Sequence, residues 1–295
     1  MQHIKISVFL LLTFLITVKA QCQQDSIRKE KLKAVIITDF VAYSGSMTGL
    51  YNLWYKDYAV SKFHLFNDNN EWLLMDKSGH FMTAYYLSKV SYDINRWARI
   101  DKKKAVLFGS GLSFIYLSTI EVFDGFSTGW GFSLGDMIAN TSGIGLFTIQ
   151  QILWDKQKLK LKWSFHKTKY PSYRPDLLGN TFSERTLKDY NGQTYWLSGN
   201  IASLFNTGYG FPKWLNIAIG YGADGMLGGN NNPVNLPYFK RQSQFYIAPD
   251  IDLSEIKTGN ENIDLLLKIL NFIKIPLPAA EFNSSGKSSL YWLYF

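Results

Sequence analysis

The chain has 295 residues, a formal net charge of +8 and a single cysteine. This length supports one large domain or two small ones, and a lone cysteine excludes an intrachain disulfide. A mean hydropathy of −0.09 argues against an ordinary polytopic inner-membrane protein. The aromatic content of 16% is high, which is typical of membrane interfaces and lipid-facing sheets as well as of large cores.

The N-terminus, residues 1–20, has the pattern of a secretory signal peptide. Lys5 precedes an apolar run over residues 6–18 that is short for a membrane span, and small residues then offer a cleavage site. Removal of the two lysines in this segment leaves a mature charge of +6. Cys22 follows the cleavage site, but the residues just before it depart from a lipidation sequence, so attachment of lipid stays open. The signal predicts export to the outer membrane or periplasm of a Gram-negative bacterium.

Positive charge clusters at residues 28–33, 102–104 and 156–162, beside apolar segments. Such clusters suggest anionic lipid headgroups, whereas nucleic acid is an improbable partner for an exported protein. The simpler alternative is that these lysines are solvated helix ends. We therefore expect membrane lipids or envelope proteins as partners.

Helical spacing of apolar residues dominates the segment 21–157. Four apolar runs of helix length contain few charges, and none is free of polar interruption: 34–51, 81–92, 105–121 and 134–153. A helical bundle with a polar interior fits this pattern better than four independent membrane spans. Whether the outside of the bundle meets lipid or water is left open.

The spacing changes to a period of two in residues 158–295. In residues 158–165, Leu, Trp and Phe alternate with lysine and serine, which predicts a half-buried strand. Further strands are expected over 194–205, 215–221, 244–253, 269–277 and 289–295, separated by turns rich in Gly, Asn and Pro. The predicted fold class is α+β, a polar-cored helical bundle followed by antiparallel β segments.

The last strand is alternating and aromatic, and it ends at Phe295. This pattern resembles the C-terminal signal of bacterial outer-membrane proteins. Six strands are few for a closed barrel, where eight or more are usual. Embedding of the β region in a membrane and a soluble antiparallel sheet are both open.

Ionisable and amide side chains recur at one-turn spacing inside the apolar helical runs. Asp76 and His80 share a helix face, as do Asp136 and Asn140, and Glu121 lies near the end of another run. Buried charge is costly unless it is paired or used, so we expect these side chains to converge between three helices. The full candidate set is, for catalysis, His80, Asp76, Glu121 and Asp136, and, for binding, Lys77, Asp124, Trp130, Ser133 and Asn140.

This set supports three interpretations. A histidine that titrates near neutral pH, beside a carboxylate, suits general acid–base chemistry. A mixed nitrogen–oxygen metal site is conceivable, but the spacing assigns no metal and no cofactor. The structural alternative is a buried hydrogen-bonded network that ties helices together, with Lys77 neutralising a carboxylate.

These motifs resemble the YfiM-like family of proposed periplasmic or outer-membrane lipoproteins, a domain of unknown function. The resemblance covers about residues 70–155. It rests on Asp76, Lys77, His80 and Phe81, on Glu121 and Asp124, on Gly129, Trp130, Ser133 and Asp136, and on Gly143. A more distant similarity, to VanZ-like membrane proteins, uses several of the same residues together with Ala139 and Asn140. The family carries no established reaction, so the resemblance implies a cell-envelope location without assigning chemistry.

The sequence therefore predicts an exported cell-envelope protein, associated with the outer membrane and noncatalytic. The alternative is an enzyme or binding protein that acts on a lipid or glycolipid through the Asp, His and Glu residues. Whether there is any catalytic activity is left undecided by these patterns.

Overall fold

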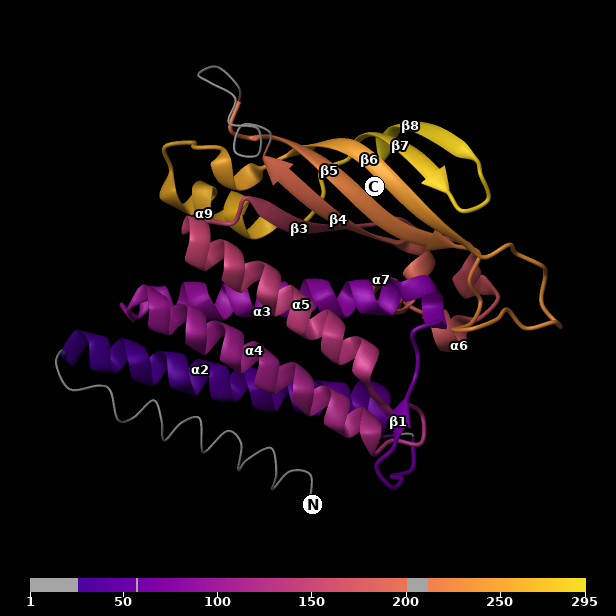
Figure 1. Cartoon of the computed structure of the whole chain (residues 1–295), viewed down its shortest axis with the longest axis horizontal. Coiled ribbons are helices and arrows are strands. Elements are labelled where there is room, and N and C mark those ends of the chain that lie inside the picture. Colours follow the sequence, from indigo (N-terminus) through magenta and orange to yellow (C-terminus); the bar gives the residue numbers. More distant parts are fainter. Residues whose placement is uncertain (1–25, 57, 201–211) are drawn as a thin grey trace. The chain divides into compact units, whose positions relative to one another are not determined.

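A computed structural model describes residues 26–56, 58–200 and 212–295 (Figure 1). The predicted signal peptide and Cys22 lie outside the described residues. The fold is α+β, with helices in the N-terminal part and an antiparallel sheet in the C-terminal part, so the predicted class is confirmed.

The chain divides into two compact units. We call the first the helical unit; it comprises the described residues up to Asp68 and Thr83–Ile152. The second, the sheet unit, comprises Asn69–Met82 and Leu153–Phe295. Two helices, Met75–Trp97 and Leu134–Trp154, contribute residues to both units. The predicted domain boundaries at 20 and 157 stay predictions.

The helical unit is built from long helices at each of the four predicted apolar runs. Their bounds are α2 (Ser26–Leu50), continued by a π-helical turn η1 (Tyr51–Tyr55), α3 (Met75–Trp97), α4 (Lys102–Gly125) and α5 (Leu134–Trp154). Two short parallel strands, β1 (Leu65–Phe66) and β2 (Phe132–Ser133), pair within this unit. Each helix extends beyond its apolar run, because polar residues at the ends satisfy the free backbone groups of the terminal turns. Asp101, for example, accepts hydrogen bonds from the amides of Lys103 and Lys104 at the start of α4.

The core of the helical unit lies where α3, α4 and α5 meet. Ala84, Leu117 and Ile144 are buried there, one from each helix. Gly109 of α4 allows the closest approach: a Cβ at this position would lie 2.7 Å from the backbone oxygen of Ser88 on α3. The contact requires a residue without a side chain, which fixes the register of the two helices.

The sheet unit holds six antiparallel strands whose spatial order follows the chain. They are β3 (Leu159–Phe165), β4 (Gln193–Asn200), β5 (Leu215–Asp224), β6 (Gln242–Ile251), β7 (Leu277–Asn283) and β8 (Ser288–Tyr294). Short helices lie between them: α6 (Pro175–Leu178), α7 (Phe182–Lys188), α9 (Glu261–Leu270), and the 3-10 turns η3 (Tyr170–Ser172), η4 (Tyr190–Gly192) and η5 (Leu253–Glu255). A further 3-10 turn, η2 (Glu71–Leu74), directly precedes α3.

The predicted strand over 269–277 is wrong. Residues up to Leu270 belong to helix α9, and the strand β7 begins only at Leu277. Asn260 caps α9 by accepting hydrogen bonds from the amides of Asn262 and Ile263, which starts a helix upstream of the apolar run. A short apolar run fits a helix or a strand equally well, so its period did not distinguish them.

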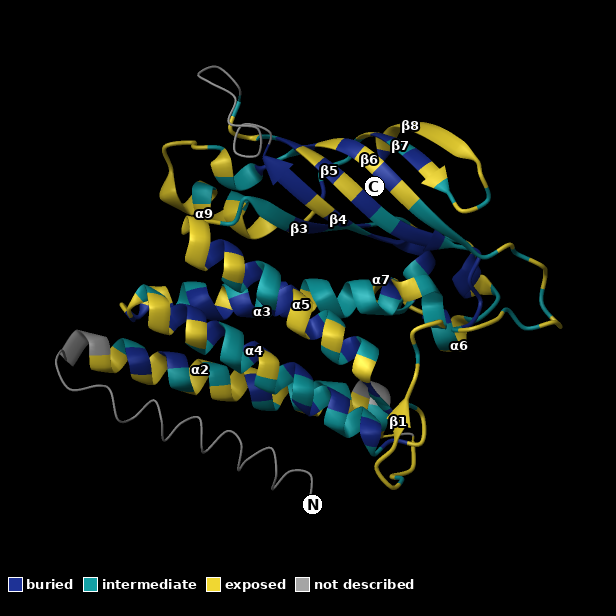
Figure 2. Cartoon of the chain, in the orientation of Figure 1, coloured by how far each residue is buried: buried dark blue, intermediate teal, exposed yellow. Residues whose placement is uncertain are grey.

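The two faces of the sheet differ in burial and in charge. We call the face that carries Trp196, Ala218 and Tyr246 the inner face, because these side chains are buried together. The opposite, outer face consists of alternate residues on the same strands, and its exposed members are Leu197, Ile217, Ile219, Phe245, Ile247 and Phe282. Figure 2 shows this alternation as buried and exposed bands along β4–β6.

The predicted strand over residues 158–165 is present as β3, but the prediction that its lysines form a solvated face is wrong. Lys162, expected on the solvated face, is fully buried on the inner face. Lys160 is also largely covered, with 16% of its side chain exposed. The physical reason is that acidic partners from distant strands lie beneath β3, so its lysines turn inward.

Candidate functional site

Asp76 and His80 lie one turn apart at the start of α3, as their spacing predicts. The His80 Nε2 atom is 3.8 Å from the Asp76 Oδ1 atom. Asp76 is further held by Lys77, whose Nζ donates to it at 3.2 Å, and by the hydroxyl of Tyr190, which donates at 3.0 Å. The side chains of Asp76 and His80 keep 26% and 22% of their surface exposed, so this pair has access to solvent. An imidazole beside a carboxylate can accept a proton or supply a metal ligand.

Glu121, Asp136 and Asn140 are buried in the helical unit, with 0%, 5% and 1% exposure. Two contacts align α4 with α5: Ser118 lies 3.8 Å from the sulfur of Met137, and Ser110 is 2.6 Å from Thr148. Glu121 follows Ser118 by one turn and Asp136 precedes Met137. The antiparallel register therefore places Glu121 and Asp136 at the same level of the unit, with Asn140 one turn further along α5.

Ser133 is part of the local structure at the start of α5. Its hydroxyl accepts a hydrogen bond from the amide of Asp136 at 3.0 Å and donates to Asp68 at 2.6 Å. This is the geometry of a helix cap, and it fixes the orientation of the first turn that carries Asp136.

Asp124 and Trp130 make contacts with the segment that follows α2. Asp124 accepts a hydrogen bond of 2.7 Å from the hydroxyl of Tyr55. The ring of Trp130 packs against the rings of Tyr55 and Tyr58, with centroids 5.7 and 4.5 Å away. Gly129 permits this packing, because a Cβ there would overlap the ring of Tyr58. These contacts hold the end of α4 and the loop that follows it against this segment.

The predicted convergence therefore has two separate parts. The structure brings Asp76, Lys77 and His80 together in the sheet unit, and it brings Glu121 and Asp136 to one level of the helical unit. Whether the two groups meet stays a prediction.

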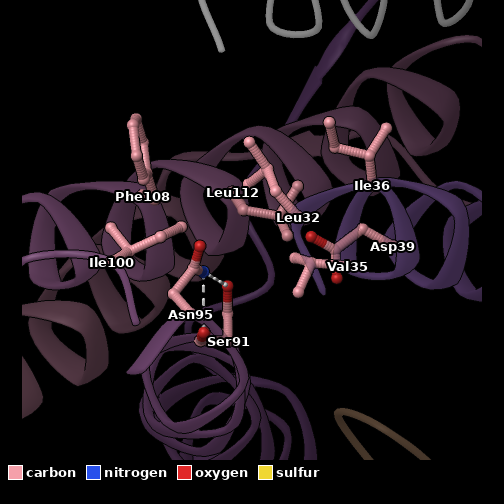
Figure 3. A pocket seen from close by; sticks show the side chains of 9 residues that line it. All are labelled: Leu32, Val35, Ile36, Asp39, Ser91, Asn95, Ile100, Phe108 and Leu112. Carbon is pink, nitrogen blue, oxygen red and sulfur yellow. Dashed lines mark hydrogen bonds between the residues drawn. The ribbon is translucent and has the colours of Figure 1, made fainter. Parts of the chain in front are cut away.

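A pocket that the sequence did not indicate lies between α2, α3 and α4 (Figure 3). Its cavity of about 20 Å³ has room for about one water molecule. Asp39 from α2 and the polar pair Ser91 and Asn95 from α3 line it together with apolar side chains. Burial raises the pKa of Asp39 to about 6. The signal in the sequence was an isolated carboxylate within an apolar run of helical spacing.

A second polar group missed from the sequence lies on the inner face of the sheet. Lys162 is 2.7 Å and Lys274 is 3.7 Å from the carboxylate of Asp250, and these three side chains have at most 1% exposure. Ser198 donates a hydrogen bond of 2.6 Å to the same carboxylate. Burial lowers the pKa of Lys162, and it lowers that of Lys274 to about 8. Two lysines on one aspartate leave an excess of positive charge, which burial disfavours.

Both units expose large apolar side chains. In the helical unit, Ile37, Leu107 and Ile149 are 62%, 68% and 57% exposed. Among the described residues, α4 meets the length and composition of a membrane-crossing helix, with a third of its apolar window buried. A core helix of a soluble protein meets the same criterion.

Residues 64–151 match the sequence family described as "Predicted periplasmic lipoprotein (DUF2279)". The matched part contains α3, α4 and α5 up to Gln151, with all the candidate site residues. No curated protein and no solved structure matches the chain. The family match supports an exported protein of the periplasm or cell envelope, and it assigns no reaction.

Proposed function

We propose that this protein is a noncatalytic component of the cell envelope, associated with the outer membrane, in which the polar residues of α3, α4 and α5 join the helices. The observation that carries the proposal is the burial of Glu121, Asp136 and Asn140 within the helical unit. A carboxylate with no exposed surface cannot reach a bulky lipid substrate, but it can hold helices in register. As part of the same proposal, we infer that the protein is related to the YfiM-like family.

The register of α3 and α5 supports a meeting of the two polar groups. Within the helical unit, the ring of Tyr85 packs on Phe147 at 6.3 Å, and Gln151 donates a hydrogen bond of 3.0 Å to Tyr92. Later residues of α3 thus pair with later residues of α5, so these helices run parallel. Continuing both helices back by about one and a half turns from the Tyr85–Phe147 pair sets His80 at the level of Asn140, one turn from Asp136.

The register of α3 and α4 leads to the same level. Gly109 lies against Ser88 and Tyr92, and Leu117, further along α4, is buried with Ala84, which comes earlier on α3, so these two helices run antiparallel. Following α3 toward its start and α4 toward its end by two turns or more aligns His80 with Glu121. A histidine between two buried carboxylates would be hydrogen-bonded to them, and such a network specifies one arrangement of the helices.

A second candidate function is action on a lipid or glycolipid. The observation that favours it is the partial exposure of Asp76 and His80, which leaves an Asp–His pair open to solvent. In this alternative His80 acts as a general base oriented by Asp76, and Lys77 binds an anionic headgroup. Both functions require the envelope location, but they differ in what loss of the polar residues does.

Paired variants distinguish the two functions. In the structural case, His80→Ala and Asp136→Asn each lower the free energy of unfolding by about 1–3 kcal/mol, through loss of a buried hydrogen bond. Asp93→Ala is the matched control on α3. It removes an exposed ion pair with Lys89 of 2.7 Å, for which a change of no more than about 0.5 kcal/mol is expected. Thermal unfolding followed by circular dichroism measures both.

The opposite pattern supports catalysis or binding. If His80→Ala keeps the wild-type melting temperature and abolishes the phenotype of the gene, the structural proposal is wrong. Cell fractionation tests the location separately. The protein is expected in the outer-membrane pellet, and recovery as a freely soluble periplasmic protein would contradict membrane association while leaving export intact.

A further inference from the structure

We propose that the exposed apolar part of the outer face of the sheet, on β4–β8, lies against the acyl chains of a lipid bilayer. This inference rests on the proposed envelope location and names both the surface and its partner. It is carried by the polarity of the sheet, by the residues at the ends of its strands and by its open edge.

The strand register assembles the outer face from continuous apolar rows. Leu197 on β4 pairs with Ile219 on β5, which pairs with Ile247 on β6; that row continues through Ala280 to Leu290 on β8. In the neighbouring row, Tyr221 pairs with Phe245 and Phe245 with Phe282. Tyr221 itself packs against Met75 and donates a hydrogen bond to the backbone oxygen of Leu73, so the exposed members of this row are Phe245 and Phe282. No ionisable acid or amine occurs in these two rows on β4–β8.

The inner face carries the charge instead. Lys162, Asp250 and Lys274 are buried there, as is Glu281, which accepts a hydrogen bond of 2.8 Å from Tyr291. An antiparallel sheet in water usually has the reverse arrangement, with its apolar face on the core and its polar face solvated. Here the charged side chains are enclosed together with the aromatic cluster of the inner face, and the opposite face exposes only apolar side chains in its central row. Charge enclosed on one face and apolar side chains exposed on the other are the pattern of a sheet in contact with lipid.

Pairs of an aromatic ring and a lysine flank the apolar rows at both ends of the strands. Before β3, Lys158 lies 4.7 Å above the ring of Trp154, and Lys213 precedes Trp214 at the start of β5. Beyond the other end of β3, Lys167 lies 5.7 Å from the ring of Phe182. Aromatic rings and lysines gather where acyl chains give way to headgroups, because the ring or stem is apolar and the amine reaches water or phosphate. The positive charge of these lysines complements anionic headgroups.

The open edge of the sheet favours a face resting on the bilayer over a sheet that crosses it. Within the described residues, β8 is the last strand of the sheet and pairs with β7 alone. Unpaired backbone groups are not tolerated in the lipid interior. With the apolar face inserted, the edge and the flanking lysines remain at the level of the headgroups.

Site-directed fluorescence tests the contact in the full mature chain. Cys22 is the only cysteine, so a Cys22→Ser background accepts single labels. Ile219→Cys and Ile247→Cys place an environment-sensitive dye on the outer face, where the native side chains are 58% and 53% exposed. Val234→Cys is the matched control, because Val234 is a fully exposed apolar residue in the loop before β6.

Vesicles of phosphatidylethanolamine and phosphatidylglycerol serve as the probe. On mixing with vesicles, the emission of the dyes at positions 219 and 247 is expected to shift to the blue. Lipids that carry a quencher on the acyl chain are expected to quench this emission, whereas the dye at position 234 should show neither effect. A dye at 219 that stays in water would overturn the inference. So would a blue shift at 219 that depends on protein concentration and needs no vesicles, because that outcome identifies a second copy of the chain as the partner.

A charge variant gives an independent readout. Ile219→Asp should lower the fraction of protein that floats with these vesicles about tenfold, since an ionised side chain on a lipid-facing strand is destabilising there. Val234→Asp should leave flotation unchanged, and equal flotation of the two variants would contradict the proposal. Fractionation of cells reports the envelope location separately. If the protein is found in the envelope but the dye at position 219 stays exposed to water, the lipid contact is wrong and the proposed function stands. If the dye contacts lipid but the protein is found in the cytoplasm, the proposed function is wrong and the lipid contact stands.

Discussion

Replacing Gly109 with alanine tests the helix contact from which the level of the candidate site is inferred. A Cβ at this position would lie 2.7 Å from the backbone oxygen of Ser88 and 3.0 Å from the backbone nitrogen of Tyr92. Both are backbone atoms of α3, so the helices must separate to admit the methyl group. Gly111, half a turn further along α4, is the matched control, because a Cβ there would have no neighbouring atom within 4 Å.

The expected magnitude follows from two opposing effects. Alanine is preferred over glycine in a helix by about 0.8–1 kcal/mol, and this gain is common to both substitutions. Overpacking at Gly109 costs about 1–3 kcal/mol, and this loss occurs only there. Gly109→Ala should therefore be less stable than Gly111→Ala by about 1–3 kcal/mol. For a protein of this size that difference corresponds to about 2–12 °C in melting temperature.

Thermal unfolding of the two variants, followed by circular dichroism, measures this difference directly. Gly111→Ala should melt at or above the wild-type temperature. If Gly109→Ala melts at the same temperature as Gly111→Ala or higher, the close approach of α3 and α4 is wrong. The alignment of Glu121 with the start of α3 would then lose its basis.

Two further predictions concern buried charge. Burial raises the pKa of Asp39 from 3.8 to about 6, so the folded protein binds more protons than the unfolded chain in this window and stability falls as pH rises through it. With an allowance for the partial exposure of Asp39, the free energy of unfolding should fall by about 1–2 kcal/mol across this window. In denaturant unfolding, Asp39→Asn should show no such dependence on pH and a higher free energy of unfolding than the wild type at pH 7. On the inner face of the sheet, Asp250→Asn leaves Lys162 and Lys274 without their carboxylate and should cost about 3–5 kcal/mol in the same assay. Lys162→Met leaves a neutral pair and should cost less; the reverse order would contradict the charge balance assigned to this cluster.

Much of the local structure could be predicted because it depends on neighbouring residues. The four apolar runs of helical spacing became α2, α3, α4 and α5, and the turn before β8 was anticipated from its Asn, Ser and Gly residues. Asp76 and His80 share a helix face because a turn of α-helix fixes that spacing. The error at 269–277 also has a local origin, since a short apolar run carries no clear period.

Long-range pairing decided what local spacing could not. Lys162 turns inward because Asp250, on a strand far along the chain, lies beneath it, and no pattern within β3 records that partner. The pocket around Asp39 likewise forms from three helices that are separate in the sequence. The sequence by itself determined the four long helices and most of the strands, since backbone hydrogen bonding and side-chain period act over a few residues. Only the tertiary structure decided which face of each strand is buried and which carboxylates are enclosed, because burial depends on the groups that packing brings together.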